Sequence, residues 1–114
     1  FKFMRITTFK ENEYYIIGIE GDLDASSSIQ LDQAIEEAVT NKESKLIVDC
    51  SQLEYISSAG LGVFMSYIQD FQENNISLVL CHLSEKVRNV FQILGLDELI
   101  KIVETKEEAK AIGQ

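Results

Sequence analysis

Residues 45–64, KLIVDCSQLEYISSAGLGVF, join a continuous apolar run to a loop with two serines and then to the beginning of a helix. The run KLIVDC (45–50) is typical of a strand that is covered on both faces of a sheet. Beyond the loop, apolar side chains recur at helical spacing and predict a helix from about 58 to 73. These side chains are Leu61, Phe64, Met65, Ile68 and Phe71. Strand, loop and helix in this order are the building block of an α/β fold.

Strands and helices alternate in the same way along the rest of the chain. Apolar patterning predicts further strands over 3–9, 13–21, 76–81 and 99–104, and helices over 27–41, 84–94 and 105–112. The polar segment KENE between the first two strands suits a hairpin turn. We therefore expect an α/β fold: a single domain over residues 1–114, with a mostly parallel sheet, an antiparallel N-terminal edge hairpin, about five strands and four helices.

Local signals set the expected helix ends. Ser27 with Gln30 has the pattern of a capping box, Ser84 is the expected N-cap of the third helix, and Gly95 is expected to end that helix. The side chains expected to face inward from the third helix are Val87, Val90, Phe91 and Leu94. Because functional crevices in such sheets lie past the carboxyl ends of the strands, the segments EGDLDASSS, SQLEYISSAG and CHLSE are expected to gather there.

Composition and charge exclude several classes of function. The 114 residues are 46% hydrophobic and 25% charged, as in an ordinary globular domain. The net charge of −9 and the lack of a basic stripe argue against binding to nucleic acid. No apolar run approaches the roughly 18 residues of a membrane span, and no signal peptide is visible, so we expect a cytoplasmic protein without a membrane partner.

The cysteines do not predict a metal site. Cys50 and Cys81 are 31 positions apart, form no CxxC motif and are expected to be reduced thiols of the core. His82 is the only histidine, and one histidine beside one cysteine is not the four-ligand set of a structural zinc site. The sequence thus predicts neither a metal nor another cofactor.

The serine loop leaves two roles open. Ser57 or Ser58 can be the N-cap of the second helix, which contributes about 1 kcal/mol, or one of them can be a chemical site. A cap alone does not explain Gly60 and Gly62, since each glycine costs roughly 1 kcal/mol in a helix interior. Small residues at this place let another surface approach the backbone, and helix N-termini favour anions.

Enzymatic chemistry fits the loop poorly. ISSAG has isoleucine where a nucleophile elbow needs its first glycine, and no Gly-Lys pair of a phosphate-binding P-loop follows. Asp22 and Asp24 could assist a phosphate site through a metal ion, although a polar turn with a helix-terminal acid is the favoured interpretation. We expect no catalytic residues and no enzymatic activity.

The stretch LIVDCSQLEYISSAGLGVF resembles the signature of STAS domains, in particular of anti-sigma-factor antagonists. That signature runs from a hydrophobic strand through Asp-x-Ser to Asp-Ser-[Ser/Ala/Thr]-Gly-Leu-Gly. The upstream GDLDASSS and the downstream SEKVRNVFQILGLDELIKI are also similar to the family's pattern, so that the resemblance covers nearly the whole chain.

The resemblance implies a set of site residues. Ser58 takes the place of the phosphorylated serine, Asp24 that of the upstream acid, and Asp49 and Ser51 those of the Asp-x-Ser. The chain departs from the family pattern at Ser57, where the family commonly has aspartate; Ser57 is therefore a rival acceptor. The residues expected to bind a partner are Asp24, Ser57, Ser58, Ala59, Gly60, Leu61, Gly62 and Ser66, with Tyr67 also outward.

The implied function is that of a bacterial partner-switching regulator of transcription, a monomer when free. Unphosphorylated, it would bind an anti-sigma factor with serine kinase activity and free a sigma factor. Phosphorylation of Ser58 would release it, and a serine phosphatase would reset the switch. The alternative is a STAS interaction module that is never phosphorylated, in a stress-sensing or transport assembly.

Overall fold

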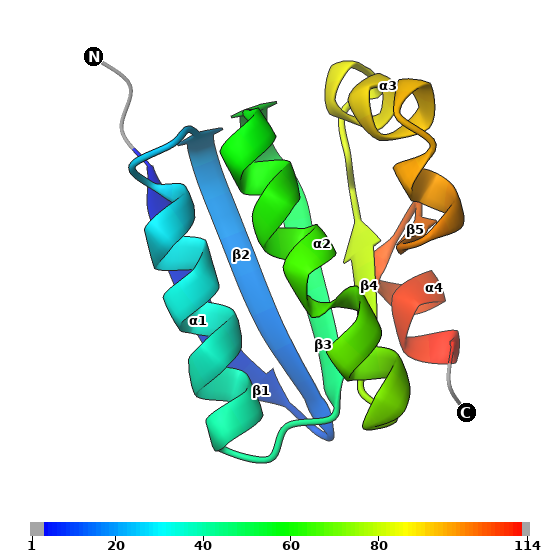
Figure 1. Cartoon of the computed structure of the whole chain (residues 1–114). Helices are drawn as coiled ribbons and strands as arrows, with labels where there is room; N and C mark the ends of the chain where they lie inside the picture. The colour runs from blue at the N-terminus through cyan, green and yellow to red at the C-terminus, as the bar shows by residue number, and fades with distance from the viewer. Residues whose placement is uncertain (1–3, 113–114) are drawn as a thin grey trace.

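Five strands form one mixed sheet in the computed structural model, which describes residues 4–112 (Figure 1). The strands are β1 (Arg5–Glu11), β2 (Tyr14–Leu23), β3 (Lys45–Ile56), β4 (Ser77–Cys81) and β5 (Lys101–Val103), and they lie in this order across the sheet. β1 and β2 form an antiparallel hairpin, and the remaining neighbours are parallel. Asn12 turns the hairpin with φ of 57°, a conformation that asparagine tolerates well.

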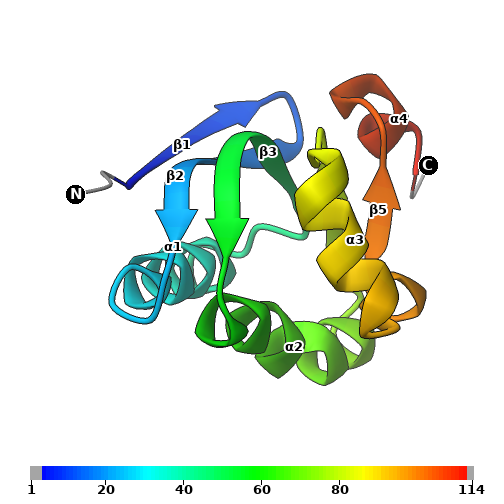
Figure 2. The same ribbon diagram turned by 90° about the horizontal axis from the view of Figure 1, so that it is seen from above.

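Helices cover the two faces of the sheet unequally (Figure 2). α1 (Ser28–Thr40), α2 (Ser58–Glu73) and α3 (Glu85–Ile93) pack on one face, and the six-residue α4 (Lys106–Ala111) lies on the other. A 3-10 turn, η1 (Leu96–Glu98), follows Gly95, whose φ of 72° ends α3. The α/β fold expected from the sequence is confirmed. No helix within residues 4–112 is long and apolar enough to cross a bilayer.

The alternation of side chains along β3 divides the core in two. Val48 and Cys50 belong to the large cluster under α1, α2 and α3, whereas Ile47 belongs to a smaller cluster near α4. Cys81 of β4 belongs to the smaller cluster, so the two cysteines point to opposite faces of the sheet. Both are free and buried, which confirms their assignment to the core.

Several local expectations were wrong. β3 continues six residues beyond residue 50, because β2 supplies pairing partners for 52, 53, 55 and 56 after register shifts. β5 is shorter than 99–104. Ser27 makes no capping hydrogen bond for α1, since its hydroxyl is engaged by the preceding turn. Met65 and Leu94 do not face inward: their exposed fractions are 43% and 58%.

Candidate functional site

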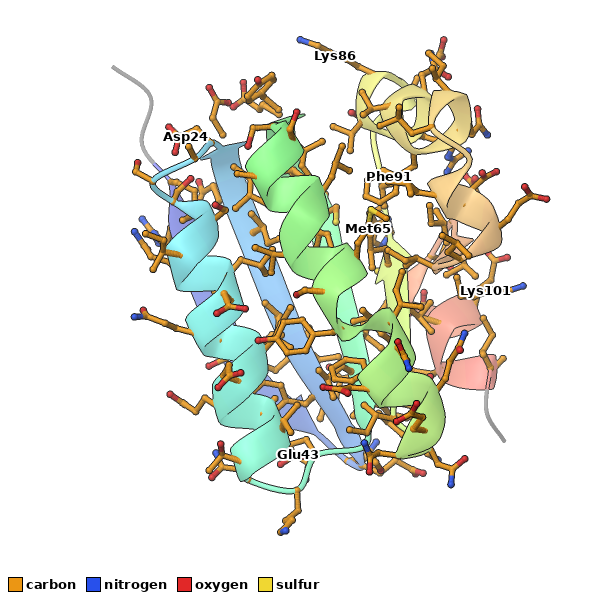
Figure 3. All side chains as sticks on the ribbon, viewed as in Figure 1. Asp24, Glu43, Met65, Lys86, Phe91 and Lys101 are labelled. Carbon is orange, nitrogen blue, oxygen red and sulfur yellow. The ribbon has the colours of Figure 1, made fainter. Side chains whose placement is uncertain are left out.

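The carboxyl ends of β2 and β3 meet beside the beginning of α2. Leu23 pairs with Ile56, and the N–H of Ser57 donates to the carbonyl of Leu23 at 2.9 Å. This bond joins the turn before α1 to the serine loop, and Figure 3 shows Asp24 at the end of the molecule where α2 begins. β4 ends lower, at Cys81, and the chain then rises to the start of α3 at the same end (Figure 1).

The two serines of the loop have different roles. Ser57 is the N-cap of α2: its backbone is extended, and its hydroxyl accepts from the N–H of Gly60 at 3.2 Å. Ser58 is the first residue of the helix and is exposed, and its hydroxyl has no hydrogen-bond partner among residues 4–112. The cap therefore occupies one hydroxyl and leaves that of Ser58 available to another molecule.

Gly60 and Gly62, near the start of α2, have different surroundings. Gly60 is buried, and a Cβ there would lie 2.8 Å from Leu23 Cδ2 and 3.0 Å from Ile56 Cγ1. Gly60 thus lets α2 approach the ends of β2 and β3. Gly62 is exposed, and a Cβ there would meet nothing within 4 Å. Of the two, only Gly62 leaves bare backbone toward solvent.

An exposed face runs along α2 from Ser58. Gly62 is four residues from both Ser58 and Ser66 and three residues from both Ala59 and Met65, which places all five on one side of the helix, and all five are exposed. We call these five residues the switch face.

Two large apolar side chains are exposed on neighbouring elements: Ile29 at the start of α1, with an exposed fraction of 60%, and Tyr55 near the end of β3, at 45%. Aromatic side chains such as that of Tyr55 are enriched at protein interfaces.

Two residues expected on this surface lie inside the molecule. Leu61 is 6% exposed and belongs to the core, as its place in the apolar stripe requires. The expectation that Tyr67 points outward was wrong, because its ring is buried against Phe71 and its hydroxyl donates to Asp32 Oδ1 at 2.6 Å. A partner that reaches the loop meets neither side chain.

Asp24 organises the turn before α1. Its carboxylate accepts from the N–H of Ser27 at 2.9 Å, from the Ser27 hydroxyl at 2.9 Å and from the Ser26 hydroxyl at 3.1 Å. These hydrogen bonds lower the pKa of Asp24 below its usual value, and the bond from the Ser27 N–H has the largest effect. The carboxylate is therefore charged at neutral pH. The structure agrees with the polar turn and helix-terminal acid favoured from the sequence.

The Asp-x-Ser pair lies away from the loop. Asp49 is eight residues before Ser57, which corresponds to about 26 Å of extended strand, and its side chain is on the sheet face of Ile47 and Cys81. Its carboxylate accepts from the N–H of Ser51 at 3.0 Å. The structure therefore separates these two residues from Asp24 and Ser58, which it brings to one end of the molecule.

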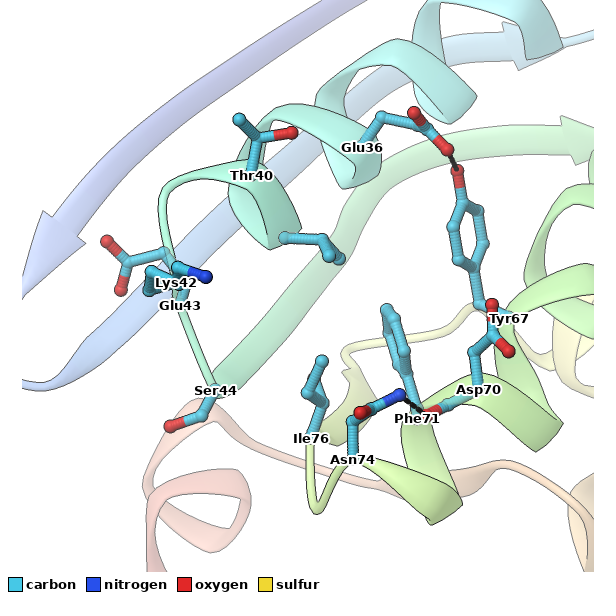
Figure 4. Close-up of a pocket in the computed structure, with 11 residues that line it drawn as sticks. Glu36, Thr40, Lys42, Glu43, Ser44, Tyr67, Asp70, Phe71, Asn74 and Ile76 are labelled. Carbon is cyan, nitrogen blue, oxygen red and sulfur yellow. Dashed lines mark hydrogen bonds between the residues drawn. The ribbon is translucent and has the colours of Figure 1, made fainter.

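A hollow of about 430 Å³ lies between the C-terminal parts of α1 and α2, at the end of the molecule away from the loop (Figure 4). Its lining includes Glu36, Asp70, Phe71 and the hydroxyl end of Tyr67, which also donates to Glu36 Oε1 at 3.3 Å. Burial and then the bond to Asp32 raise the pKa of Tyr67. No pattern in the sequence indicates this link between the helices, because it depends on how α1 and α2 are placed.

Curated relatives share nearly the full length of the chain. BtrV of Bordetella bronchiseptica is 31% identical to this chain over 108 residues, which are 95% of this chain and 93% of that protein. Its name assigns it provisionally to the anti-sigma factor antagonists. The anti-sigma-B factor antagonist of Listeria monocytogenes is 27% identical over 99 residues, or 87% of each chain.

Solved structures share the fold. The crystal structure of an anti-sigma factor antagonist from Mycobacterium paratuberculosis matches with a TM-score of 0.86 at 18% identity, covering 95% of this chain and 92% of that one. The phosphorylated form of SpoIIAA, a Bacillus cell fate determinant, matches with a TM-score of 0.70 at 22% identity, covering 97% and 99%. The model of the STAS domain family matches residues 5–109. The family expected from the serine loop is confirmed: the chain belongs to the STAS domain family.

Proposed function

We propose that this protein is an anti-sigma factor antagonist that binds, through the switch face, an anti-sigma factor with serine kinase activity, and that phosphorylation of Ser58 releases it. The observation that carries the proposal is that the two neighbouring serines have different structural roles. Ser57 caps α2, whereas the Ser58 hydroxyl is exposed beside the bare backbone of Gly62. The names of its relatives are those of regulators, and one matching structure is of a phosphorylated protein.

The fold tolerates a phosphate at Ser58. A phosphoserine carries nearly two negative charges, and the first turn of a helix favours an anion because its N–H groups and dipole are positive there. Ser58 is exposed, so its ester would displace no packed side chain. We therefore expect phosphorylation to leave the domain folded.

The same phosphate is unfavourable once a partner covers the switch face. Ser58 and Gly62 are one helical turn apart, so a partner in contact with Gly62 lies within reach of the new phosphate. The interface would have to desolvate this charge, and the bulk of the phosphate would hold the surfaces apart. Asp24, which is charged at the same end of the molecule, adds to the negative potential that a phosphate would meet.

The departure from the family pattern at Ser57 is structurally conservative. Aspartate and serine are about equally good N-caps, and Ser57 makes the bond to Gly60 that an aspartate would make from the same place. The replacement therefore preserves the shape of the loop. This favours Ser58 over Ser57 as the acceptor, because a phosphate on Ser57 would disturb the cap.

Incubation with ATP and a panel of sigma-factor-regulating kinases tests the proposal. We expect intact-mass spectrometry to show the gain of one phosphoryl group and fragmentation to place it on Ser58. Ser58→Ala should remain unmodified, and Ser57→Ala, the matched control one residue away, should still accept phosphate. Phosphate on Ser57, with Ser58→Ala still a full substrate, would move the site by one residue.

A serine phosphatase that restores the original mass would complete the switch. Partner binding without any phosphorylation would support the alternative module that is never phosphorylated.

A further inference from the structure

The geometry points to a second site, on the sheet face opposite the switch face, in which Asp49, Cys81 and His82 bind a Zn²⁺ ion. Their potential ligand atoms, a carboxylate oxygen, the thiol sulfur and an imidazole nitrogen, lie within 4.8 Å of one another. This site is independent of the proposed regulatory function.

The sheet register brings two of the three groups together. Asp49 of β3 pairs with Cys81 of β4 in the parallel ladder, so their side chains leave neighbouring strands on the same face. Cys81 and His82 are neighbours in the sequence, whereas Asp49 precedes Cys81 by 32 positions. Sequence spacing therefore does not indicate that the three groups lie together.

An unusual backbone conformation supplies the third group. Consecutive strand residues point to opposite faces, so His82 would be expected to turn away from Cys81. Instead, His82 has φ of 58°, in the left-handed region that few residues other than glycine adopt. Its N–H donates to the carbonyl of Glu104 at 3.2 Å, which holds the turn against the residue that follows β5. The turn places the imidazole on the side of Asp49 and Cys81.

These ligands match the chemistry of zinc. Thiolate, imidazole and carboxylate bind Zn²⁺ at about 2.0–2.3 Å, so that ligand atoms in a tetrahedral site are roughly 3.5 Å apart. Zinc binding requires the ligand atoms to move from within 4.8 Å of one another to about this spacing. Three protein ligands leave the fourth position to water, and His82 is exposed, which gives the ion a side open to solvent. Mg²⁺ and Ca²⁺ require oxygen ligands and would bind poorly to this set.

The surrounding charges favour a cation on balance. Two carboxylates, those of Asp49 and Glu107, and one ammonium, that of Lys106, act on the Cys81 thiol. Burial, followed by the charge of Asp49, raises the pKa of this thiol to about 11, so it is protonated until a metal displaces the proton.

Titration of the reduced protein with Co²⁺, a spectroscopic substitute for Zn²⁺, tests the site without any partner protein. We expect a thiolate-to-cobalt absorption band that saturates at one equivalent and is abolished by added Zn²⁺. Cys81→Ser should lose the band. Cys50→Ser, the matched control on the opposite face of the sheet, should keep it. Asp49→Asn and His82→Ala should each weaken Co²⁺ binding at least tenfold.

A second measurement covers variants that fail to fold. His82 is the only histidine, so its ring protons give a single pair of NMR signals in the wild-type protein, and these should shift on addition of one equivalent of Zn²⁺. The proposal is overturned by absence of the cobalt band in the wild-type protein, by its survival in Cys81→Ser, or by histidine signals that zinc does not move.

Discussion

Substitution by alanine of Gly60 and of Gly62, the two glycines of α2, should change stability in opposite directions. At position 60 the new methyl group would lie 2.8 Å from Leu23 Cδ2 and 3.0 Å from Ile56 Cγ1, closer than packed carbons allow. Overpacking of this kind costs about 1–3 kcal/mol, and the gain in helix propensity returns at most about 1 kcal/mol. We expect Gly60→Ala to lower the free energy of unfolding by about 1–2 kcal/mol.

Gly62→Ala is the matched control in the same helix. Its methyl group meets no atom within 4 Å, so only the helix propensity changes, and we expect a gain of about 0.5–1 kcal/mol. The two variants should thus differ by about 2 kcal/mol. With an entropy of unfolding of about 0.24 kcal/mol/K for a chain of this size, the melting temperatures should differ by roughly 8 °C.

Calorimetry and urea unfolding measure both variants. The double variant Gly60→Ala/Leu23→Ala adds a stricter test, because removal of the Leu23 side chain relieves the clash. The loss from Gly60→Ala should therefore be smaller in the Leu23→Ala background than in the wild-type protein. A Gly60→Ala protein as stable as Gly62→Ala would refute the role of Gly60 in the packing of α2 on the sheet.

Three further predictions concern the serines, the turn acid and the thiols. Ser57→Ala should cost about 1 kcal/mol in urea unfolding because it removes a cap, whereas Ser58→Ala should change stability by less than about 0.5 kcal/mol; a larger loss from Ser58→Ala would contradict the assignment. Asp24 has a lowered pKa in the folded state. Its contribution to the free energy of unfolding is therefore present above the usual pKa of 3.8 and is lost as the pH falls through the folded-state pKa. The stability deficit of Asp24→Asn measured near neutral pH should accordingly shrink in acid, and a deficit that stays constant down to pH 2 would contradict the hydrogen-bond account. Cys50 and Cys81, both buried, should react slowly with alkylating reagents in the native protein and quickly in urea, and rapid native labelling of either would reveal an opening that the structure does not show.

Local periodicity accounts for the parts of the fold that the sequence predicted well. α2 was expected over 58–73 and is found at Ser58–Glu73, because its apolar stripe and the asparagines after it mark both the helix and its end. The end of β3 was missed for the converse reason. Residues 51–56 mix polar and apolar side chains, and they form a strand because β2 is long enough to pair with them.

The roles of individual loop residues depend on contacts that sequence spacing does not contain. Both glycines look alike in the sequence, and only the packing of Leu23 and Ile56 against position 60 separates them. Tyr67 lies three residues after Phe64 and four before Phe71, which is the spacing of the buried side of α2, but only the structure reveals that Asp32 on α1 accepts its hydroxyl. Either serine could cap α2 as far as the sequence shows, and the extended backbone of Ser57 identifies it as the N-cap.

The affinity of a cognate anti-sigma factor for this protein before and after phosphorylation tests the central claim most directly. We expect phosphorylation mapped to Ser58, and to a lesser degree Ser58→Asp, to weaken binding by at least about thirtyfold, the equivalent of losing about 2 kcal/mol at the centre of an interface. Ser57→Asp, which keeps a capping side chain at the position before the acceptor, should bind as the wild-type protein does. Equal affinity of the Ser58-phosphorylated and unphosphorylated proteins would contradict the proposed switch.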